Sequence, residues 1–317
     1  MARAFVFPGQ GSQALGMGKD LADAFPAARL VFEEVNETLK QNLSKVMFEG
    51  PDDQLRLTAN AQPALMAVSI AIIRVLQEEG NVSVPDLADF VAGHSLGEYA
   101  ALAAAGALSL SDTARLLKLR GTMMQIAVPV GEGAMAALMG PTVEETEEIA
   151  AAAVSAGDAG EVCDLANDNA PGQVVVSGSM ATVERAVEIA GERGVKRCIM
   201  LPVSAPFHCS LMQPAADAMA DALASTIITP PSVPLIANVT ADEVRVPEKI
   251  RNNLVGQVTG RVRWRESMMA LKEKGVDTLI EAGSGKVLSG LARRIDRELS
   301  AVSVQEPEDI ENFLASL

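Results

Sequence analysis

The pentapeptide Gly93-His94-Ser95-Leu96-Gly97 is the feature that most restricts the fold of this chain. Residues 89–93 favour a buried strand, and the Ala-rich stretch that follows the pentapeptide favours a helix. A serine at such a sharp strand-to-helix turn adopts a strained backbone, and flanking glycines remove the side chains that would collide there. The pattern therefore predicts an α/β architecture in which the Ser95 hydroxyl is exposed at a helix N-terminus.

The rest of the chain predicts a large α/β domain interrupted by a small one. With 317 residues, the chain is long enough for two domains. A short buried strand is expected at 3–7, and residues 61–79 are apolar enough to form a helix buried in a sizeable core. Ser111 or Asp112 is expected to cap a further helix. The last expected element is a terminal helix from residue 286.

Residues 134–201 predict strand, helix, strand, strand, helix, strand, which is the ferredoxin-like βαββαβ pattern. Within it, the segment 167–172 is rich in Asn, Asp, Pro and Gly and predicts a turn between two strands. We therefore expect an α/β-hydrolase-like catalytic domain with a parallel sheet at 1–129 and 202–317, and a ferredoxin-like domain at 130–201.

Charge and cysteine content exclude several classes of protein. The formal net charge is −15, which disfavours binding to nucleic acid or to an anionic membrane surface. The three cysteines are odd in number and widely spaced, so neither a disulfide framework nor a metal site is expected. The apolar run before Pro8 is too short for a signal peptide. We expect a cytoplasmic protein.

Ser95 is a candidate nucleophile, and a serine needs a base within hydrogen-bond reach. The chain has only two histidines, His94 and His208. Adjacent residues of an extended segment point in opposite directions, so His94 is badly placed to take the Ser95 proton and is expected to support the turn. His208 lies in the Pro-containing loop 203–208. By elimination, His208 is the expected base.

Two glycine-rich turns and one arginine leave alternatives open. The turn at 9–14 matches a loose dinucleotide-binding pattern, but it could instead present a backbone N–H near Ser95. The turn Gly283-Ser284-Gly285-Lys286 lacks the earlier glycine and the final Ser or Thr of a phosphate-binding loop. Arg120 lies on an apolar helix. It could reach solvent or a surface carboxylate, or bind a substrate carboxylate beside the serine.

These features together resemble the malonyl-CoA:acyl carrier protein transacylases of bacterial type II fatty acid synthesis. The resemblance covers essentially the whole chain. It rests on six elements of the sequence, which are Phe7-Pro8-Gly9-Gln10-Gly11-Ser12-Gln13, Gly93-His94-Ser95-Leu96-Gly97-Glu98-Tyr99, Arg120, Asn167 within its Asn-Asp-Asn-Ala-Pro-Gly-Gln segment, Pro206-Phe207-His208 and Gly283–Lys286. The family often has Pro where this chain has Ser284.

The resemblance implies a ping-pong reaction through a malonyl ester of Ser95, with His208 as the base and the Gln257 backbone carbonyl orienting it. It implies oxyanion donors at the N–H groups of Gln10 and Leu96. The substrate contacts that it implies are Arg120, Asn167 and Phe207, with Phe207 disfavouring an α-methyl branch. It implies malonyl-CoA and acyl carrier protein as partners, and neither a metal nor a redox cofactor.

Two further expectations concern partners and alternatives. Residues 249–297 contain 11 Lys and Arg against five acidic residues, so this basic segment is a candidate docking face for an acidic carrier protein. The same serine turn would also suit a serine esterase or thioesterase, and the 9–14 turn leaves a nucleotide-binding domain as a third hypothesis.

Overall fold

The short apolar segment at the N-terminus forms the middle of a six-stranded sheet. In the computed structural model, which describes residues 2–203 and 205–317, β1 (Ala2–Phe7) pairs in parallel with β2 (Phe90–Gly93) and β9 (Val276–Ala282). Parallel pairing extends to β10 (Ser300–Val304) and β7 (Leu235–Ile236), whereas β8 (Glu243–Val244) is antiparallel. Met1, and Ser204 of the predicted 203–208 loop, lie outside the described residues.

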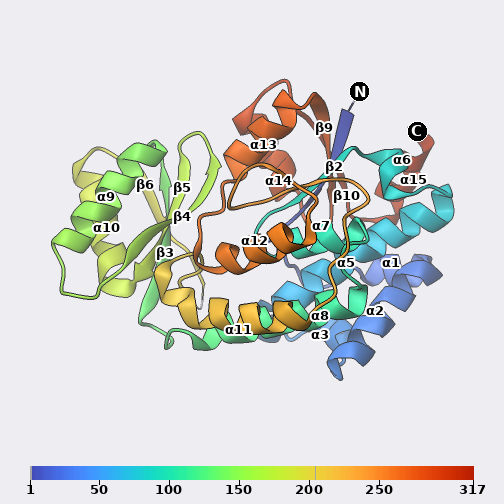
Figure 1. The fold of residues 1–317 in the computed structure, drawn as a ribbon, viewed down its shortest axis with the longest axis horizontal. Coiled ribbons are helices and arrows are strands. Elements are labelled where there is room, and N and C mark those ends of the chain that lie inside the picture. The colour runs from blue at the N-terminus through green and yellow to red at the C-terminus, as the bar shows by residue number, and fades with distance from the viewer. Residues whose placement is uncertain (1, 204) are drawn as a thin grey trace.

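Helices cover both faces of this sheet (Figure 1). Phe5 and Phe7 of β1 lie in one core cluster with α5 (Thr58–Gly80), because alternate residues of a strand face opposite sides. Ala4 and Val6 face the other core cluster, which contains Trp264 of α13 (Trp264–Glu273) and residues of α14 (Val287–Ile295). A strand that is apolar on both faces is typical of a parallel sheet buried between helices.

The predicted apolar helix at 61–79 is confirmed, and it begins slightly earlier. α5 is long and apolar enough to cross a membrane by length and composition, but 89% of its most apolar window is buried inside the protein. It packs against α2 (Pro26–Leu39) and α8 (Leu110–Ile126) and lies close to α7 (Gly97–Ala104). The other helices outside residues 130–201 are α1 (Lys19–Ala24), α3 (Leu43–Glu49), α4 (Asp52–Arg56), α6 (Val84–Leu87), the 3-10 turn η1 (Ser210–Met212), α11 (Gln213–Ser225), α12 (Pro247–Thr259) and α15 (Pro307–Ala315).

The second sheet is antiparallel and has four strands in the order β4-β5-β3-β6. Its strands are β3 (Gly133–Met139), β4 (Cys163–Ala170), β5 (Gln173–Ser179) and β6 (Arg197–Met200), and its helices are α9 (Val143–Ser155) and α10 (Met180–Glu192). Both helices pack on one face and enclose a separate core cluster. The chain is therefore a mixed α/β protein with one mainly parallel and one antiparallel sheet.

Three local predictions are wrong. Residues 167–170 lie within β4, so the predicted turn is confined to Pro171 and Gly172; two register shifts accommodate this polar segment in the sheet. The helix cap falls at Ser109, whose hydroxyl accepts the N–H of Asp112 at 3.0 Å. The helix expected from 286 ends at Ile295 and is followed by β10 and α15.

Candidate active site

Ser95 lies on a strained turn between β2 and α7. Its φ of 55° is in the left-handed region, which a non-glycine residue rarely adopts. A Cβ on Gly93 would lie 1.9 Å from the carbonyl carbon of Gly97, and one on Gly97 would lie 2.2 Å from the carbonyl oxygen of Phe7. Both flanking glycines are therefore required by close backbone approach, as the pentapeptide predicts.

His208 lies 113 residues further along the chain, and its imidazole reaches Ser95. The Ser95 Oγ is 2.7 Å from Nε2, and Nδ1 is 2.8 Å from the backbone carbonyl oxygen of Gln257. A carbonyl only accepts, so Nδ1 carries the proton and Nε2 is free to accept from the serine. Burial, and then the nearby Arg120 charge, lower the pKa of His208 to about 3. The ring is therefore neutral and able to act as a base.

Arg120 is buried beside the serine and donates only to neutral acceptors. Nη1 donates to the side-chain oxygen of Gln62 at 2.8 Å, and Nη2 donates to that of Gln257 at 2.8 Å and to Ser95 Oγ at 3.2 Å. Nε has no partner, and no carboxylate of residues 2–203 or 205–317 lies within 4.0 Å of this guanidinium. A buried cation without an ion pair is available to a carboxylate of a ligand.

The side chain of Gln257 joins several parts of the site. Its Nε2 donates to the Ser95 carbonyl at 2.9 Å and to Glu98 Oε2 at 2.8 Å. Asn238 supports the same turn from the end of β7, because its Oδ1 accepts the Ser95 N–H at 2.8 Å and its N–H donates to Glu98 at 3.0 Å. Burial raises the pKa of Glu98 to about 7.

Two backbone N–H groups near Ser95 lack an acceptor. The neighbouring N–H groups of Ser95 and Gly97 are bonded, whereas those of Gln10 and Leu96 donate to no atom in the described part of the chain. The loop of Gln10 is braced by the second glycine-rich turn, since Ser284 Oγ donates to the Ser12 carbonyl at 2.8 Å. No helix follows the 9–14 turn directly, as dinucleotide binding would require, because α1 begins at Lys19.

A cavity of about 340 Å³ opens onto these groups from between the two sheets. Most of the predicted site residues line its wall. Arg56 also lines it and is a second cation there besides Arg120. The lining consists of Gln10, Gly11, Gln13, Arg56, Gln62, His94, Ser95, Arg120, Met124, Met135, Asn167, Asn169, Val175, Leu201, Pro202, Val203, Phe207 and His208. The structure thus brings Gln10, Ser95, Arg120, Asn167, Phe207 and His208 to one cavity, with Leu96 and Gln257 behind it.

His94 points away from the Ser95 hydroxyl. Its Nε2 lies 2.8 Å from Asn169 Oδ1, and its ring packs against Trp264 with centroids 5.5 Å apart. This contact connects the serine turn to β4 of the antiparallel sheet. The neighbouring Asp168 is buried and paired with Arg265 at 2.8 Å. These contacts fix the two sheets against each other around the cavity.

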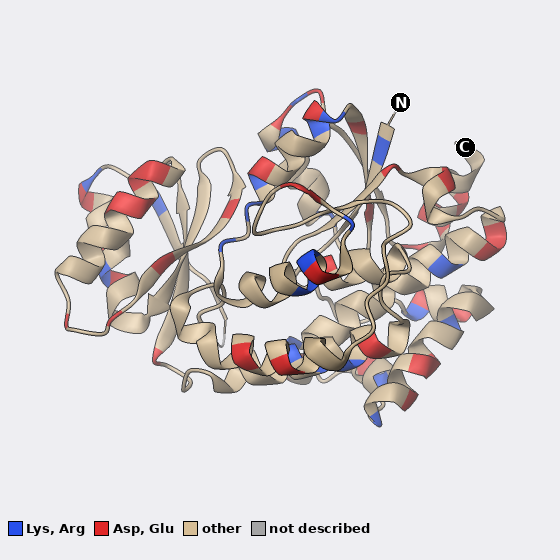
Figure 2. Cartoon of the chain, in the orientation of Figure 1, with Lys and Arg blue, Asp and Glu red and all other residues tan. Residues whose placement is uncertain are grey.

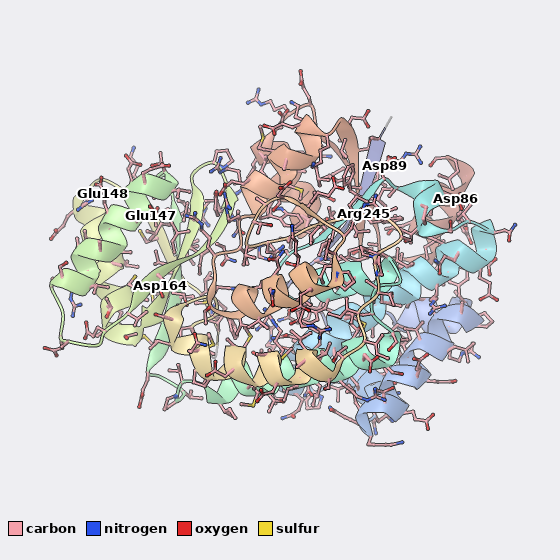
Figure 3. All side chains as sticks on the ribbon, in the orientation of Figure 1. Asp86, Asp89, Glu147, Glu148, Asp164 and Arg245 are labelled. Carbon is pink, nitrogen blue, oxygen red and sulfur yellow. The ribbon has the colours of Figure 1, made fainter. Side chains whose placement is uncertain are left out.

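Many cations of the basic segment 249–297 are already paired with carboxylates, which its sequence does not show. Six of its cations are paired with carboxylates: Arg251, Arg261, Arg263, Arg265, Lys272 and Lys274. Figure 2 shows acidic and basic positions intermixed around α13. Glu147, the partner of Arg261, lies on α9 of the small sheet together with Glu148 (Figure 3). Lys249, Lys286, Arg293, Arg294 and Arg297 have no carboxylate partner within the described ranges.

Sequence reasoning assigns no role to Gln62, Glu98 and Asn238. All three are buried polar residues at the site. Gln62 and Glu98 stand within or beside strongly apolar helices, where a polar side chain needs a partner, and this contrast is the sequence signal that could have identified them. Asn238 follows β7 and offers no comparable signal.

Comparison with known proteins gives consistent matches over the whole chain. Residues 4–302 match the family model described as an acyl transferase domain. The chain is 46% identical over 314 residues to the malonyl CoA-acyl carrier protein transacylase of Bacillus subtilis, covering 99% of this chain and 96% of the relative. The crystal structure of an acyl-carrier-protein S-malonyltransferase from Bartonella henselae superposes with a TM-score of 0.96 at 56% identity, covering 100% and 99% of the two chains. A malonyl-transacylase in complex with its type II PKS acyl-carrier protein gives a TM-score of 0.95 at 41% identity, with full coverage of both chains.

Proposed function

Because this chain belongs to the malonyl CoA-acyl carrier protein transacylase family of acyl transferases, we propose that it transfers malonyl from malonyl-CoA to acyl carrier protein through an ester of Ser95. This transfer supplies malonyl groups for fatty acid synthesis. The observation that carries the proposal is the buried Arg120 guanidinium, which pairs with no carboxylate of the described residues and whose Nη2 lies 3.2 Å from the Ser95 hydroxyl oxygen. An acyl group with its own carboxylate fits that position.

The first half-reaction forms the ester. His208 Nε2 takes the hydroxyl proton as Ser95 Oγ attacks the thioester carbonyl of malonyl-CoA. The N–H groups of Gln10 and Leu96 stabilise the tetrahedral oxyanion, since neither donates to an atom of residues 2–203 or 205–317. The carbon–sulfur bond then breaks, and the CoA sulfur leaves with the proton held by His208.

The second half-reaction reverses these steps with a new thiol. His208 removes the proton of the carrier phosphopantetheine thiol, whose sulfur attacks the malonyl ester. The carbon–oxygen bond breaks and Ser95 recovers its proton from His208. The Gln257 carbonyl keeps the imidazole oriented in both halves. No residue in this scheme requires a metal or a redox cofactor.

Two lining residues have proposed roles in substrate choice. Phe207 is buried and lies in the cavity wall next to the base, where its ring would crowd an α-methyl branch on the acyl group. Asn167 lines the same cavity from β4 and is proposed as a polar contact for substrate. Both roles concern the acyl chain and the pantetheine arm rather than bond breaking.

We also propose the finer organisation of the chain. The mainly parallel sheet and the Ser95 turn support a hydrolase-like catalytic domain at 1–129 and 202–317. The element order β3-α9-β4-β5-α10-β6 supports a ferredoxin-like domain at 130–201. The expected cytoplasmic location belongs to the same proposal, since fatty acid synthesis by separate enzymes needs access to a diffusing carrier.

Docking of the carrier is proposed at the cations of the basic segment that lack carboxylate partners. An acidic carrier gains most from charges that are not already paired. Lys249, Lys286, Arg293, Arg294 and Arg297 are therefore better candidates than Arg261 and Arg265, which are held by Glu147 and by the buried Asp168.

The proposal is tested by labelling with [¹⁴C]malonyl-CoA in the absence of carrier. The wild-type protein should acquire acid-stable label at Ser95 and release it to added carrier, while Ser95→Ala should remain unlabelled. Label retained on Ser95→Ala contradicts the proposal. Rapid hydrolysis of p-nitrophenyl esters without any thiol acceptor would favour the esterase alternative.

A further inference from the structure

Glu98 is a fully buried carboxylate three residues after Ser95, and the reaction scheme does not use it. No lysine or arginine of the described ranges lies within ion-pair distance of it. Its Oε2 accepts from the Asn238 N–H and from Gln257 Nε2, and its Oε1 has no partner. Burying a carboxylate without a cation in contact is costly, so its position needs a compensating role.

The Gln257 amide stands between Glu98 and Arg120. Nε2 donates to Glu98 at 2.8 Å, and Oε1 accepts from Arg120 Nη2 at 2.8 Å. A guanidinium only donates, and the Ser95 carbonyl, which also accepts from Nε2, only accepts. The amide therefore has one orientation, and Glu98 accepts from its donor side.

We propose that Glu98 is a positioning residue for the malonyl carboxylate, acting through Gln257 to hold Arg120 in place and unpaired. This inference rests on the proposed function. A direct Glu98–Arg120 ion pair would neutralise the guanidinium, whereas the intervening amide contacts Nη2 with the negative end of a dipole and carries no net charge. Gln257 also orients His208 through its backbone carbonyl, so this one residue connects the carboxylate site to the base.

Replacing Glu98 with Gln tests the orientation directly. A glutamine at 98 can turn its own NH2 group toward Gln257 Nε2, which places two donors against each other on that side of the amide. The Gln257 amide is then held less firmly, and so is the guanidinium that it contacts. Acetyl-CoA has no carboxylate, so its loading depends less on Arg120. We expect the malonyl-to-acetyl ratio of Ser95 loading rates to fall about tenfold or more, as for loss of a hydrogen bond to a charged group.

A matched control and a second variant complete the design. Glu281→Gln changes another fully buried glutamate, which accepts two backbone N–H groups at the start of α14, and should leave the ratio unchanged. Gln257→Leu keeps the backbone carbonyl and should lower the ratio as Glu98→Gln does. Adding Glu98→Gln to Gln257→Leu should lower it no further, because the effect passes through the amide.

The experiment measures loading rates with radiolabelled malonyl-CoA and acetyl-CoA, and melting temperatures for every variant. A ratio that is unchanged or raised in a folded Glu98→Gln protein overturns the inference, and so do effects of Glu98→Gln and Gln257→Leu that multiply in the double variant. If Glu98→Gln does not fold, an unchanged ratio in Gln257→Leu overturns it. Wild-type protein that takes no malonyl label contradicts the proposed function, whereas labelled wild type with an unchanged ratio in the variants contradicts only the role of Glu98.

Discussion

Arg120 in the cavity around Ser95 and Arg265 in the basic segment 249–297 differ in whether a carboxylate is paired with them. In the cavity, Arg120 is buried among neutral acceptors and one of its donors is unused. In the basic segment, Arg265 binds the buried Asp168, and other cations are paired on the surface. A paired cation stabilises the protein, whereas an unpaired buried one is available to a ligand. Whether a cation is paired with a carboxylate therefore distinguishes a ligand-binding cation from a structural one more clearly than the number of charges in a region does.

The largest expected effect tests whether the reaction centre is independent of the carboxylate site. His208→Ala removes the base that both acyl donors need. Loading of malonyl and of acetyl should fall together by about 10²–10⁴-fold, the range for general base catalysis. His94→Ala is the control and should keep the loading rate within a few-fold, since its ring contacts Asn169 rather than the serine. A loss confined to malonyl would contradict the assignment of His208.

The next effect concerns stability in the paired region. Arg265→Ala leaves Asp168 buried without its cation and should lower the free energy of unfolding by about 2 kcal/mol, less than for a fully buried pair because Arg265 is partly exposed. Arg115→Ala breaks an exposed pair with Asp112 and should cost at most about 0.5 kcal/mol. Urea unfolding of both variants measures the difference. Equal costs would show that Arg265 is as free as a surface cation.

A smaller effect is expected at the unpaired cations of the basic segment. Replacing Arg293 and Arg297 with Gln should raise the KM for acyl carrier protein a few-fold, and the increase should shrink at high salt. Arg261→Gln should change this KM less, because Glu147 already neutralises that side chain. Steady-state assays at two salt concentrations make the comparison. A larger effect at Arg261 would place docking on the paired face.

The smallest expected effect concerns pH, because the rate of acyl loading should not show the titration of an ordinary histidine. Burial lowers the pKa of His208 from 6.5 to about 3, so the neutral base persists below the pH at which a free histidine is protonated. Acetyl loading, which does not use the carboxylate site, should therefore stay level between pH 8 and pH 5. A halving of the rate near pH 6.5 would show that the imidazole is solvated like a free one.

The sequence predicts the centre of the site better than its surroundings. The Ser95 turn is local, so five residues and the flanking pattern are enough to predict it. The scarcity of histidine then points to His208. Gln62, Glu98 and Asn238 come from separate helices and a strand end, and only the packing of those elements brings them together.

The fold shows the same division between local and distant information. The apolar helix and the main strands follow from hydrophobic patterns. The segment 167–170 has the composition of a turn, but pairing with β5 and two register shifts place it in a strand. Distant pairing has outweighed local preference there. Of the helices between Lys19 and Arg56, α1, α3 and α4 are too short for a periodic pattern to predict, whereas α2 has 14 residues and buries one face, so its pattern could have been recognised.

The measurement that tests the central claim most directly is the acyl preference of Arg120→Ala. Rates of Ser95 loading with malonyl-CoA and acetyl-CoA are compared with those of the wild type. If the unpaired guanidinium binds the malonyl carboxylate, malonyl loading should fall by about 10²-fold or more, and acetyl loading should be kept or improved. An unchanged malonyl-to-acetyl ratio would contradict the claim that Arg120 recognises the substrate carboxylate.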